Sequence, residues 1–290
     1  MELIAASRIV KAQARVKAAR PYSEKITEVI RNLASGGAGL KHPLLQPRDD
    51  VRTVAYVVVT SDRGLCGGYN TSVIRTTERA MRADEAAGRT TKLFVIGKKG
   101  LTYFRFRGAA IEASFLGVTD QPTYEQARQI AAAVSAAFDT EGVDAVEVVY
   151  TQFLSAGSQR VVTRRLMPLD ASALEGAEGG SASYEFEPSP DVILERLLPR
   201  YAEARLFAAL LDASASEHAA RQRAMKSATD NAEELKKTLS RIMNRARQDA
   251  ITTEIMEIVS GAEALRAGQG GGPDHANDLF GPDFVAGDAA

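Results

Sequence analysis

The sequence contains one cysteine, Cys66, in 290 residues, so no disulfide can form within the chain. A lone cysteine suits a reducing compartment, and the length exceeds that of small disulfide-stapled scaffolds. Long apolar runs are absent as well, because the longest, at residues 54–59 and 206–211, fall far short of the ~20 residues of a membrane-spanning helix. Residues 1–17 do not show the regions of a signal peptide. We therefore expect a cytoplasmic protein that crosses no membrane by itself.

Histidines are scarce, and the usual nucleotide-binding motifs are missing. His42, His218 and His275 fall in a loop, a long helix and the tail. A catalytic triad or a histidine metal site would therefore have to assemble from three unrelated elements. Neither GxGxxG nor GxxxxGK[ST] occurs in the sequence. We expect no catalysis by this chain alone, no metal ion and no cofactor.

The most enzyme-like segment is SDRGLCGGYN, residues 61–70, between a buried strand and a helix. A Gly-rich turn in this position can aim backbone donors at a phosphate. The interpretation that we favour is a tight strand-to-helix turn in which Gly64, Gly67 and Gly68 give the backbone room. Cys66 could be an activated thiol at the helix N-terminus, but nucleophilic catalysis also needs a base, and the neighbouring sequence supplies none.

Charge is nearly balanced overall but unevenly distributed. Residues 267–290 contain four Asp and no Lys or Arg, so the net charge of −1 leaves +3 on residues 1–266. Residues 1–34 and 219–247 are both basic. No aromatic or Gly-rich nucleic-acid motif accompanies them, so we expect protein partners and no nucleic acid.

The first segment, residues 1–36, shows the 3/4 alternation of apolar and small residues that is typical of a coiled-coil helix. Proline removes a backbone donor and crowds the preceding turn, so we expect a bend or a short break at Pro21. Gly36 and Gly37 are expected to end the helix. The seam consists of Ala5, Ile9, Ala12, Val16, Ala19, Ile26, Ile30 and Leu33.

A second and much longer helix is predicted for residues 189–266. Ser189 and Pro190 supply an N-cap and a first-turn proline. A rise of ~1.5 Å per residue makes this helix on the order of 115 Å long, against ~50 Å for the first. We expect the first helix to pair with the seam in its second half as an intramolecular antiparallel coiled coil. That seam consists of Ala228, Ala232, Leu235, Leu239, Ile242 and Ala246.

The last turns of the long helix need another partner, because the first helix can cover less than half of its length. Apolar side chains there would otherwise project into water, so we expect another chain to surround this end. Polar residues in the same turns, ordinarily solvated surface, become candidate contacts with that chain. The apolar residues are Ile251, Ile255, Ile258 and Val259, and the polar ones are Arg247, Gln248, Thr252 and Glu254.

The middle of the chain, residues 50–188, alternates β-branched runs with helical patterns, which predicts a small α/β sheet domain. Helices are expected near residues 69–87 and 124–138. The polar, Gly-rich stretch DASALEGAEGGSAS is expected to be a mobile loop, and residues 267–290 a disordered tail. Strands are expected in VRTVAYVVVT, TKLFVIG, AVEVVYTQF, QRVVTRRLMP and SYEFEP.

Several blocks resemble the gamma subunit of F-type ATP synthases, the central rotor stalk. The blocks are IAASRIVKAQ and RPYSEKI in the first helix, TSDRGLCGGYN in the sheet domain, and ASEHAARQRAMKSATDNAEEL and ARQDAITTEIMEIVSGAEAL in the last helix. The resemblance covers about residues 1–266. It implies an α/β chain with a long antiparallel two-helix coiled coil and a small Rossmann-like domain, in which the coil inserts into a hexameric ring of catalytic chains.

The resemblance also implies a role and partners. The chain would carry torque between a proton-driven membrane ring and the catalytic hexamer, and ATP chemistry would belong to its partners. The expected partners are the alpha and beta subunits of the hexamer, the epsilon subunit and the membrane c-ring, at the cytoplasmic face of the bacterial membrane. By similarity, Met1 matches a methionine facing the lever of the catalytic subunits. The four polar residues near the end of the long helix, Arg247, Gln248, Thr252 and Glu254, match shaft positions that contact the ring.

Two features depart from the family. Its members usually begin roughly two dozen basic, helix-forming residues before the position of Met1. Either the start codon has been assigned too late, which we favour, or the sequence is a fragment, or the shaft is shortened and its exposed seam weakens assembly. The acidic tail after Arg266 lies beyond the usual end of the family's helix. Two other functions stay open at this point: a phosphate- or nucleotide-binding α/β enzyme that uses the turn from Gly64 to Gly68 and dimerises through its coil, and a coiled-coil scaffold without rotary function.

Overall fold

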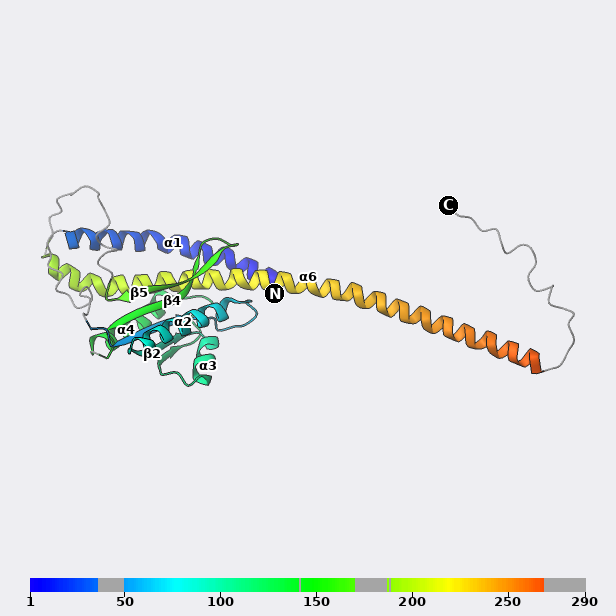
Figure 1. Ribbon diagram of the computed structural model, residues 1–290. Coiled ribbons are helices and arrows are strands. Elements are labelled where there is room, and N and C mark those ends of the chain that lie inside the picture. The colour runs from blue at the N-terminus through cyan, green and yellow to red at the C-terminus, as the bar shows by residue number, and fades with distance from the viewer. Residues whose placement is uncertain (36–49, 141, 170–186, 188, 269–290) are drawn as a thin grey trace. The chain divides into compact units, whose positions relative to one another are not determined.

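The computed structural model (Figure 1) describes residues 1–35, 50–140, 142–169, 187 and 189–268. The chain divides into two compact units, Met1–Ala228 and Thr229–Ala290. The first unit contains the sheet, the helices that cover it and the first part of the long helix. The described part of the second unit is the continuation of that helix. The expected strand in SYEFEP and the expected mobile loop and tail lie outside the described residues, apart from Glu187 and the last residues of the helix.

A five-stranded sheet forms the centre of the first unit. The strand order is β3-β2-β1-β4-β5. The first four strands in this order are parallel, and β5 pairs with β4 in the antiparallel sense. A parallel order of 3-2-1-4 is that of doubly wound α/β sheets. The strands are β1 (Thr53–Val59), β2 (Thr90–Ile96), β3 (Ile111–Phe115), β4 (Ala145–Phe153) and β5 (Gln159–Met167).

Helices cover both faces of the sheet, and this burial on both faces explains why the sequence of β1 is apolar throughout. Ala55, Val57 and Val59 point into a core shared with α4 (Tyr124–Asp139). The alternate residues of β1 point into a second core under α2 (Tyr69–Ala86) and α3 (Lys98–Phe106). A strand buried on both faces needs apolar side chains at every position. The predicted strands and the two predicted helices of the middle segment are confirmed in the described part, and the structure adds α3 and β3.

Helix α1 (Glu2–Ser35) is continuous through Pro21, so of the expected bend or short break, the break is wrong. Pro21 is exposed, and its ring therefore crowds only the preceding turn of its own helix and no neighbouring element. The described part of the helix ends at Ser35, and Gly36 and Gly37, which are expected to end it, lie outside the described residues. Six of the eight residues of the predicted seam are buried, at positions 5, 9, 12, 26, 30 and 33, whereas Val16 and Ala19 are half-buried.

Helix α6 (Pro190–Gly268) is 79 residues long and continuous through Pro199. Its first part lies beside α1 in Figure 1, and the two helices share one core, in which Ile30 and Leu33 join Leu194, Leu198 and Tyr201. The pairing predicted above was therefore placed on the wrong part of the long helix. The physical reason is side-chain size: the first part of α6 offers large apolar residues, whereas the predicted seam at 228–246 is half alanine.

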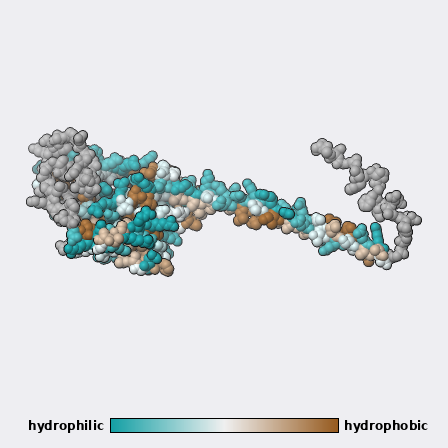
Figure 2. Space-filling model, viewed as in Figure 1, coloured by the Kyte–Doolittle hydropathy of each residue, from teal (hydrophilic) through white to brown (hydrophobic). Residues whose placement is uncertain are grey.

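The second unit exposes apolar side chains along its helix. Figure 2 shows the hydrophobic patches on this part of the helix. The leucine and isoleucine residues of the predicted seam are each more than half exposed, and the last turns expose further isoleucine, methionine and valine. The exposed apolar residues are Leu235, Leu239, Ile242, Met243, Ile251, Ile255, Met256, Ile258, Val259 and Leu265. Among the described helices, none combines the length and apolar character needed to span a membrane.

Candidate functional site

The turn between β1 and α2 is held by the side chain of Asn70. Its Oδ1 accepts hydrogen bonds from the Ser61 backbone nitrogen, at 2.8 Å, and from the Ser61 hydroxyl, at 3.0 Å. Its Nδ2 donates to the Cys66 sulfur at 3.2 Å. These bonds tie the end of β1 to the first turn of α2. The turn of residues 61–70 is therefore a preformed structure.

Only one of the three glycines in this turn needs glycine for its backbone angle. Gly67 has φ +57°, whereas Gly64 and Gly68 lie outside the left-handed region. A Cβ added at Gly64 or Gly68 would meet its nearest neighbour at an ordinary 3.5 or 3.8 Å. Leu65 takes the other left-handed position, with φ 62°. The prediction of a tight turn is confirmed, but its reliance on all three glycines is wrong.

Helix α6 packs across this turn at the carboxyl end of the sheet. Arg221 Nε donates to the Gly64 carbonyl at 3.3 Å. The hydroxyl of Tyr69 donates to the Ala213 carbonyl at 3.2 Å. Further along the sheet edge, the Ser216 hydroxyl donates to the carbonyl of Thr151, at the end of β4, at 3.0 Å. The long helix is thus bonded to two neighbouring strand ends.

A buried ion pair lies on α6 at this junction. Arg221 Nη2 and Glu217 Oε1 are 2.6 Å apart, and the Glu217 side chain is only 2% exposed. Burial raises the pKa of Glu217, and the nearby positive charge of Arg221 partly offsets this effect. The other carboxylate oxygen, Oε2, is buried without a hydrogen-bond partner in the described residues. Charge is therefore buried where the helix meets the sheet.

Asp120, in the segment between β3 and α4, joins three elements. Its carboxylate bonds to Arg8 of α1, and its Oδ1 lies 3.5 Å from Nε2 of His218 on α6. Burial alone would raise the pKa of Asp120, but the hydrogen bond and charge of Arg8, followed by the charge of His218, outweigh burial and lower it. Burial lowers the pKa of His218. Asp120 is therefore an ionised carboxylate to which α1 and α6 both bind.

We call this set of residues the polar junction: Arg8, Ser61, Asn70, Asp120, Glu217, His218 and Arg221. The chemistry of these side chains suits a structural contact rather than catalysis. Cys66 is buried against Ser61 and Asn70, and neither is a base strong enough to activate a thiol. Within the described residues no three His, Cys, Asp or Glu side chains are grouped to hold a metal ion. His42 and His275 lie outside them.

Sequence reasoning missed most of the polar junction. His218 was treated as an isolated histidine of the long helix, and Arg8, Asp120, Glu217 and Arg221 were not singled out. One signal was available: Glu217, His218 and Arg221 interrupt a run of Ala and Ser, which is unusual for a solvated helix face. Such a run of small residues indicates close helix packing, so charges inside it indicate a buried polar contact.

Of the predicted contact residues, Met1 lies near Arg8 in sequence, and the other four follow the polar junction along α6. Met1 precedes α1 and is 67% exposed. The four polar residues of the last helix, Arg247, Gln248, Thr252 and Glu254, are exposed in the second unit. Thr252 donates its hydroxyl to the Gln248 carbonyl one turn earlier, at 2.9 Å, and that bond lies within the helix. Within the second unit, residues 248 and 252 share one face and residues 247 and 254 a neighbouring one.

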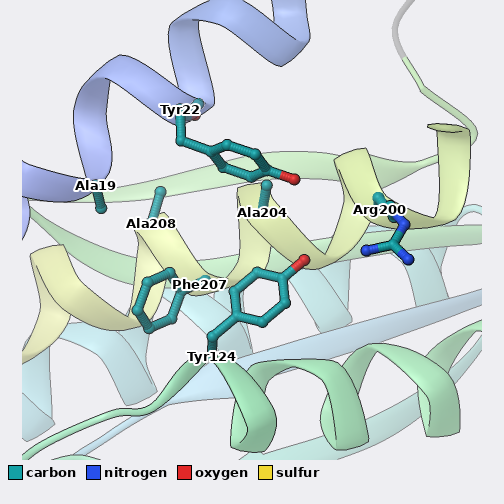
Figure 3. Close-up of a pocket in the computed structure, with 8 residues that line it drawn as sticks. Ala19, Tyr22, Tyr124, Arg200, Ala204, Phe207 and Ala208 are labelled. Atoms are coloured by element: carbon teal, nitrogen blue, oxygen red, sulfur yellow. The ribbon is translucent and has the colours of Figure 1, made fainter.

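A pocket of about 330 Å³ lies between α1, α4 and α6 (Figure 3). Tyr124 at the start of α4 donates to Glu203 Oε2 at 2.8 Å, and its ring meets Phe207 edge-on at 5.6 Å. Tyr22 of α1 extends over the same pocket in Figure 3. The three helices therefore meet here through aromatic rings as well as through the core.

Comparison with known proteins decides the family. A family model described as ATP synthase matches residues 1–265. The ATP synthase gamma chain of Frankia casuarinae is 52% identical over 274 residues, which are 92% of each chain. The gamma chain of Saccharopolyspora erythraea is 47% identical over 279 residues, with 91% of this chain and 90% of that one covered. The chain belongs to the gamma-chain family of the F-type ATP synthases. It is a stalk subunit of that complex and not one of its catalytic chains.

Solved structures of the family share the fold. A chain from the central stalk and c-ring structure of the Tetrahymena thermophila mitochondrial ATP synthase has a TM-score of 0.60 at 24% identity, with 79% of this chain and 97% of that one covered. A chain from the Euglena gracilis mitochondrial enzyme has a TM-score of 0.57 at 20% identity, with 93% and 98% covered. At these identities the likeness concerns the fold.

Proposed function

We propose that the chain transmits torque through α6, with the polar junction as the place where the helix is locked to the sheet domain. The observation that carries this proposal is one continuous helix whose residues up to Arg221 are bonded to two strand ends, while residues 229–268 expose apolar surface. A twisting shaft needs a rigid anchor at one end and a contact surface at the other. The bonds that Arg221 and Ser216 donate to the sheet domain resist slippage, because a shift of the helix would break them.

We propose that α1 and the first part of α6 form an antiparallel two-helix coiled coil. The shared core, the seam of α1 and the opposite chain directions in Figure 1 support this pairing. The sheet domain would be a Rossmann-like foot, supported by its parallel 3-2-1-4 order. We retain the division into a first helix to residue 36, a foot at 50–188, a long helix at 189–266 and a separate tail.

We propose that the alpha and beta subunits of a hexameric ring enclose the last part of α6. The apolar residues exposed there need a cover that the chain's own described residues do not supply within the second unit. The foot would meet the epsilon subunit and the membrane c-ring, at the cytoplasmic face of the membrane. Membrane association would come through the complex alone.

We propose that Met1, Arg247, Gln248, Thr252 and Glu254 contact the catalytic subunits. All five are exposed, so their polar or flexible ends are available to another chain. Replacing Arg247 and Gln248 together by alanine should lower proton-driven ATP synthesis by at least about tenfold, because each residue would lose bonds to an enclosing chain. Inverted membrane vesicles that carry the variant complex would measure this rate.

The matched control is the double replacement of Lys236 and Lys237 by alanine, on an exposed part of the same helix. It removes two positive charges where the first variant removes one, changes helix propensity comparably, and should leave synthesis within about twofold of the unchanged complex. Circular dichroism should show equal helix content in both variants. A normally assembled complex that synthesises ATP at the full rate with the first variant would refute the proposed contacts.

A further inference from the structure

Residues 235–247 of α6 combine exposed apolar side chains with positive charge, and we call them the basic stretch. Each of its four large apolar side chains is more than half exposed. The stretch contains five Lys or Arg and no Asp or Glu. The apolar residues are Leu235, Leu239, Ile242 and Met243, and the basic ones are Lys236, Lys237, Arg241, Arg245 and Arg247.

The apolar residues of the basic stretch form one stripe with positive charge on both borders. At about 100° per residue, the first three of them fall within about 60° of one another around the helix. Lys236 and Arg247 lie on one border of this stripe, and Arg245 lies on the other. The surface therefore suits a segment that combines apolar side chains with acidic ones.

The next turns of α6 offer a similar apolar surface with the opposite charge. Residues 248–265 also expose isoleucine, methionine and valine side chains, but they contain four Asp or Glu and no Lys or Arg. An acidic segment is repelled by these turns and attracted to the basic stretch. Charge thus selects between two apolar surfaces on the same helix.

The chain carries an acidic and apolar segment directly after this helix. Residues 269–290, which lie outside the described residues, contain four Asp and no Lys or Arg. Every Leu, Val and Phe of this tail falls in the block DLFGPDFV, residues 278–285, together with Asp278 and Asp283. The block therefore complements the basic stretch in both hydropathy and charge, and it belongs to the same unit of the chain.

The length of the tail matches the distance that it has to span. The basic stretch ends 21 and begins 33 residues before Gly268, the last residue of α6, which places it about 32–50 Å back along the helix at ~1.5 Å per residue. The block begins 10 and ends 17 residues after Gly268, and an extended chain of that length reaches at most about 33–61 Å. Three consecutive glycines, at 270–272, permit the reversal of direction.

We propose that residues 278–285 fold back onto the basic stretch of the isolated chain, with the rings of Phe280 and Phe284 on the apolar stripe and the two Asp side chains beside its basic borders. The contact covers apolar surface that the unassembled chain would otherwise expose. A tethered segment has an effective concentration in the millimolar range, so even a weak contact is populated. The docking does not depend on the proposed rotor function, whereas its displacement by an enclosing ring rests on that function.

Hydrogen exchange on the isolated full chain, followed by mass spectrometry at short labelling times, tests the docking. Phe280→Ser combined with Phe284→Ser should make residues 235–247 exchange at least about threefold faster than in the unchanged chain, because the docked tail protects them. Residues 251–265 should exchange at the same rate in both chains. Equal exchange of the basic stretch in both chains would refute the inference.

The matched control is Gln269→Ser combined with His275→Ser, two replacements in the tail outside the block. This variant should exchange as the unchanged chain does. Faster exchange of the basic stretch in the control, equal to that of the phenylalanine variant, would show that the block is not the segment that docks and would overturn the assignment.

Charge reversal tests the pairing of the two segments. Asp278→Lys combined with Asp283→Lys should remove the protection of the basic stretch, because like charges then face each other. Adding Lys236→Glu and Arg247→Glu should restore at least part of it, since only charges that meet can compensate each other. Protection that survives the reversal of the two Asp would contradict the proposed contact.

Dilution distinguishes the tail of the same chain from the tail of a second copy. Docking within one chain is independent of protein concentration, so an about tenfold dilution should leave the protection of the basic stretch unchanged. Protection that falls on dilution would identify a second copy as the occupant and refute docking within the chain.

Discussion

At the scale of single residues, the polar junction shows how charges can be buried in a stalk subunit that performs no chemistry. Arg221 reaches Glu217 on its own helix and carbonyls of the turn on the sheet domain. The pair lies one helical turn apart, so the helix itself sets its geometry. Because the arginine also bonds across to Arg63 and Gly64, the pair fixes the register of the helix on the sheet.

Arg221→Met should destabilise the chain by about 3 kcal/mol, because it leaves the buried Glu217 carboxylate without its counter-charge. Urea unfolding of the full chain, followed by circular dichroism, would measure the change. Adding Glu217→Gln should recover part of the loss, since the uncompensated charge is then removed.

Arg245→Met is the matched control for this prediction. Arg245 and Asp249 have the same spacing of four residues, but their nearest atoms are 4.0 Å apart and both side chains are mostly exposed. Exposed pairs contribute roughly 0–1 kcal/mol, so this variant should unfold almost as the unchanged chain does. Equal effects of the two methionine variants would show that the buried pair adds nothing to stability.

At the scale of elements, α1 is held in place mainly by the one apolar face that packs into the core. Ile30 is fully buried in the core that α1, α4 and α6 share, whereas its neighbour Val29 is 43% exposed. The two residues differ by one position in sequence and by about 100° around the helix. Their different surroundings follow from the 3/4 spacing of the seam alone.

Ile30→Ala should lower the free energy of unfolding by about 2–4 kcal/mol, since it removes buried methyl groups and leaves a cavity. Val29→Ala, which removes less buried surface, should cost under about 1 kcal/mol. Urea unfolding of both variants would compare them. If the two losses are equal, α1 is not packed as described, and the proposed coil with α6 loses its main support.

At the scale of the whole molecule, the two units differ in how their helix is stabilised. The first unit supports α6 with a core and with the polar junction, whereas residues 229–268 are exposed throughout. A helix without a packing partner is marginal in water, because most helical stability in proteins comes from tertiary contacts. We therefore expect the second unit to depend on the proposed partner chains for its order.

Hydrogen exchange on the isolated chain should show residues 229–268 exchanging at least about a hundredfold faster than residues 200–221, which are held in the core. In the assembled synthase, the first of these segments should become protected, because the enclosing ring would bury it. Mass spectrometry of peptides from both segments, in both states, would measure the difference. Equal protection of the two segments in the isolated chain would contradict this view of the second unit.

The strands and helices were predictable because each depends on local pattern. The apolar run at 54–59 indicated a strand buried on both faces, and the seam of the first helix indicated the face that is now buried. Of the bend or short break expected at Pro21, the break does not occur, because a helix can carry a proline on its exposed face when the packing of its other face offsets the cost. The partner of the first helix was also placed wrongly, because periodicity specifies a face but not what covers it.

The sequence by itself determined that this chain has two long seam-bearing helices around an α/β centre, that it lacks the usual phosphate motifs, and which family it resembles. These properties reside in composition, spacing and short blocks of residues. Only the tertiary structure decided that Arg8, Asp120 and His218 meet. Residues this far apart in the sequence leave no periodic signal, because their contact depends on how the sheet and helices pack.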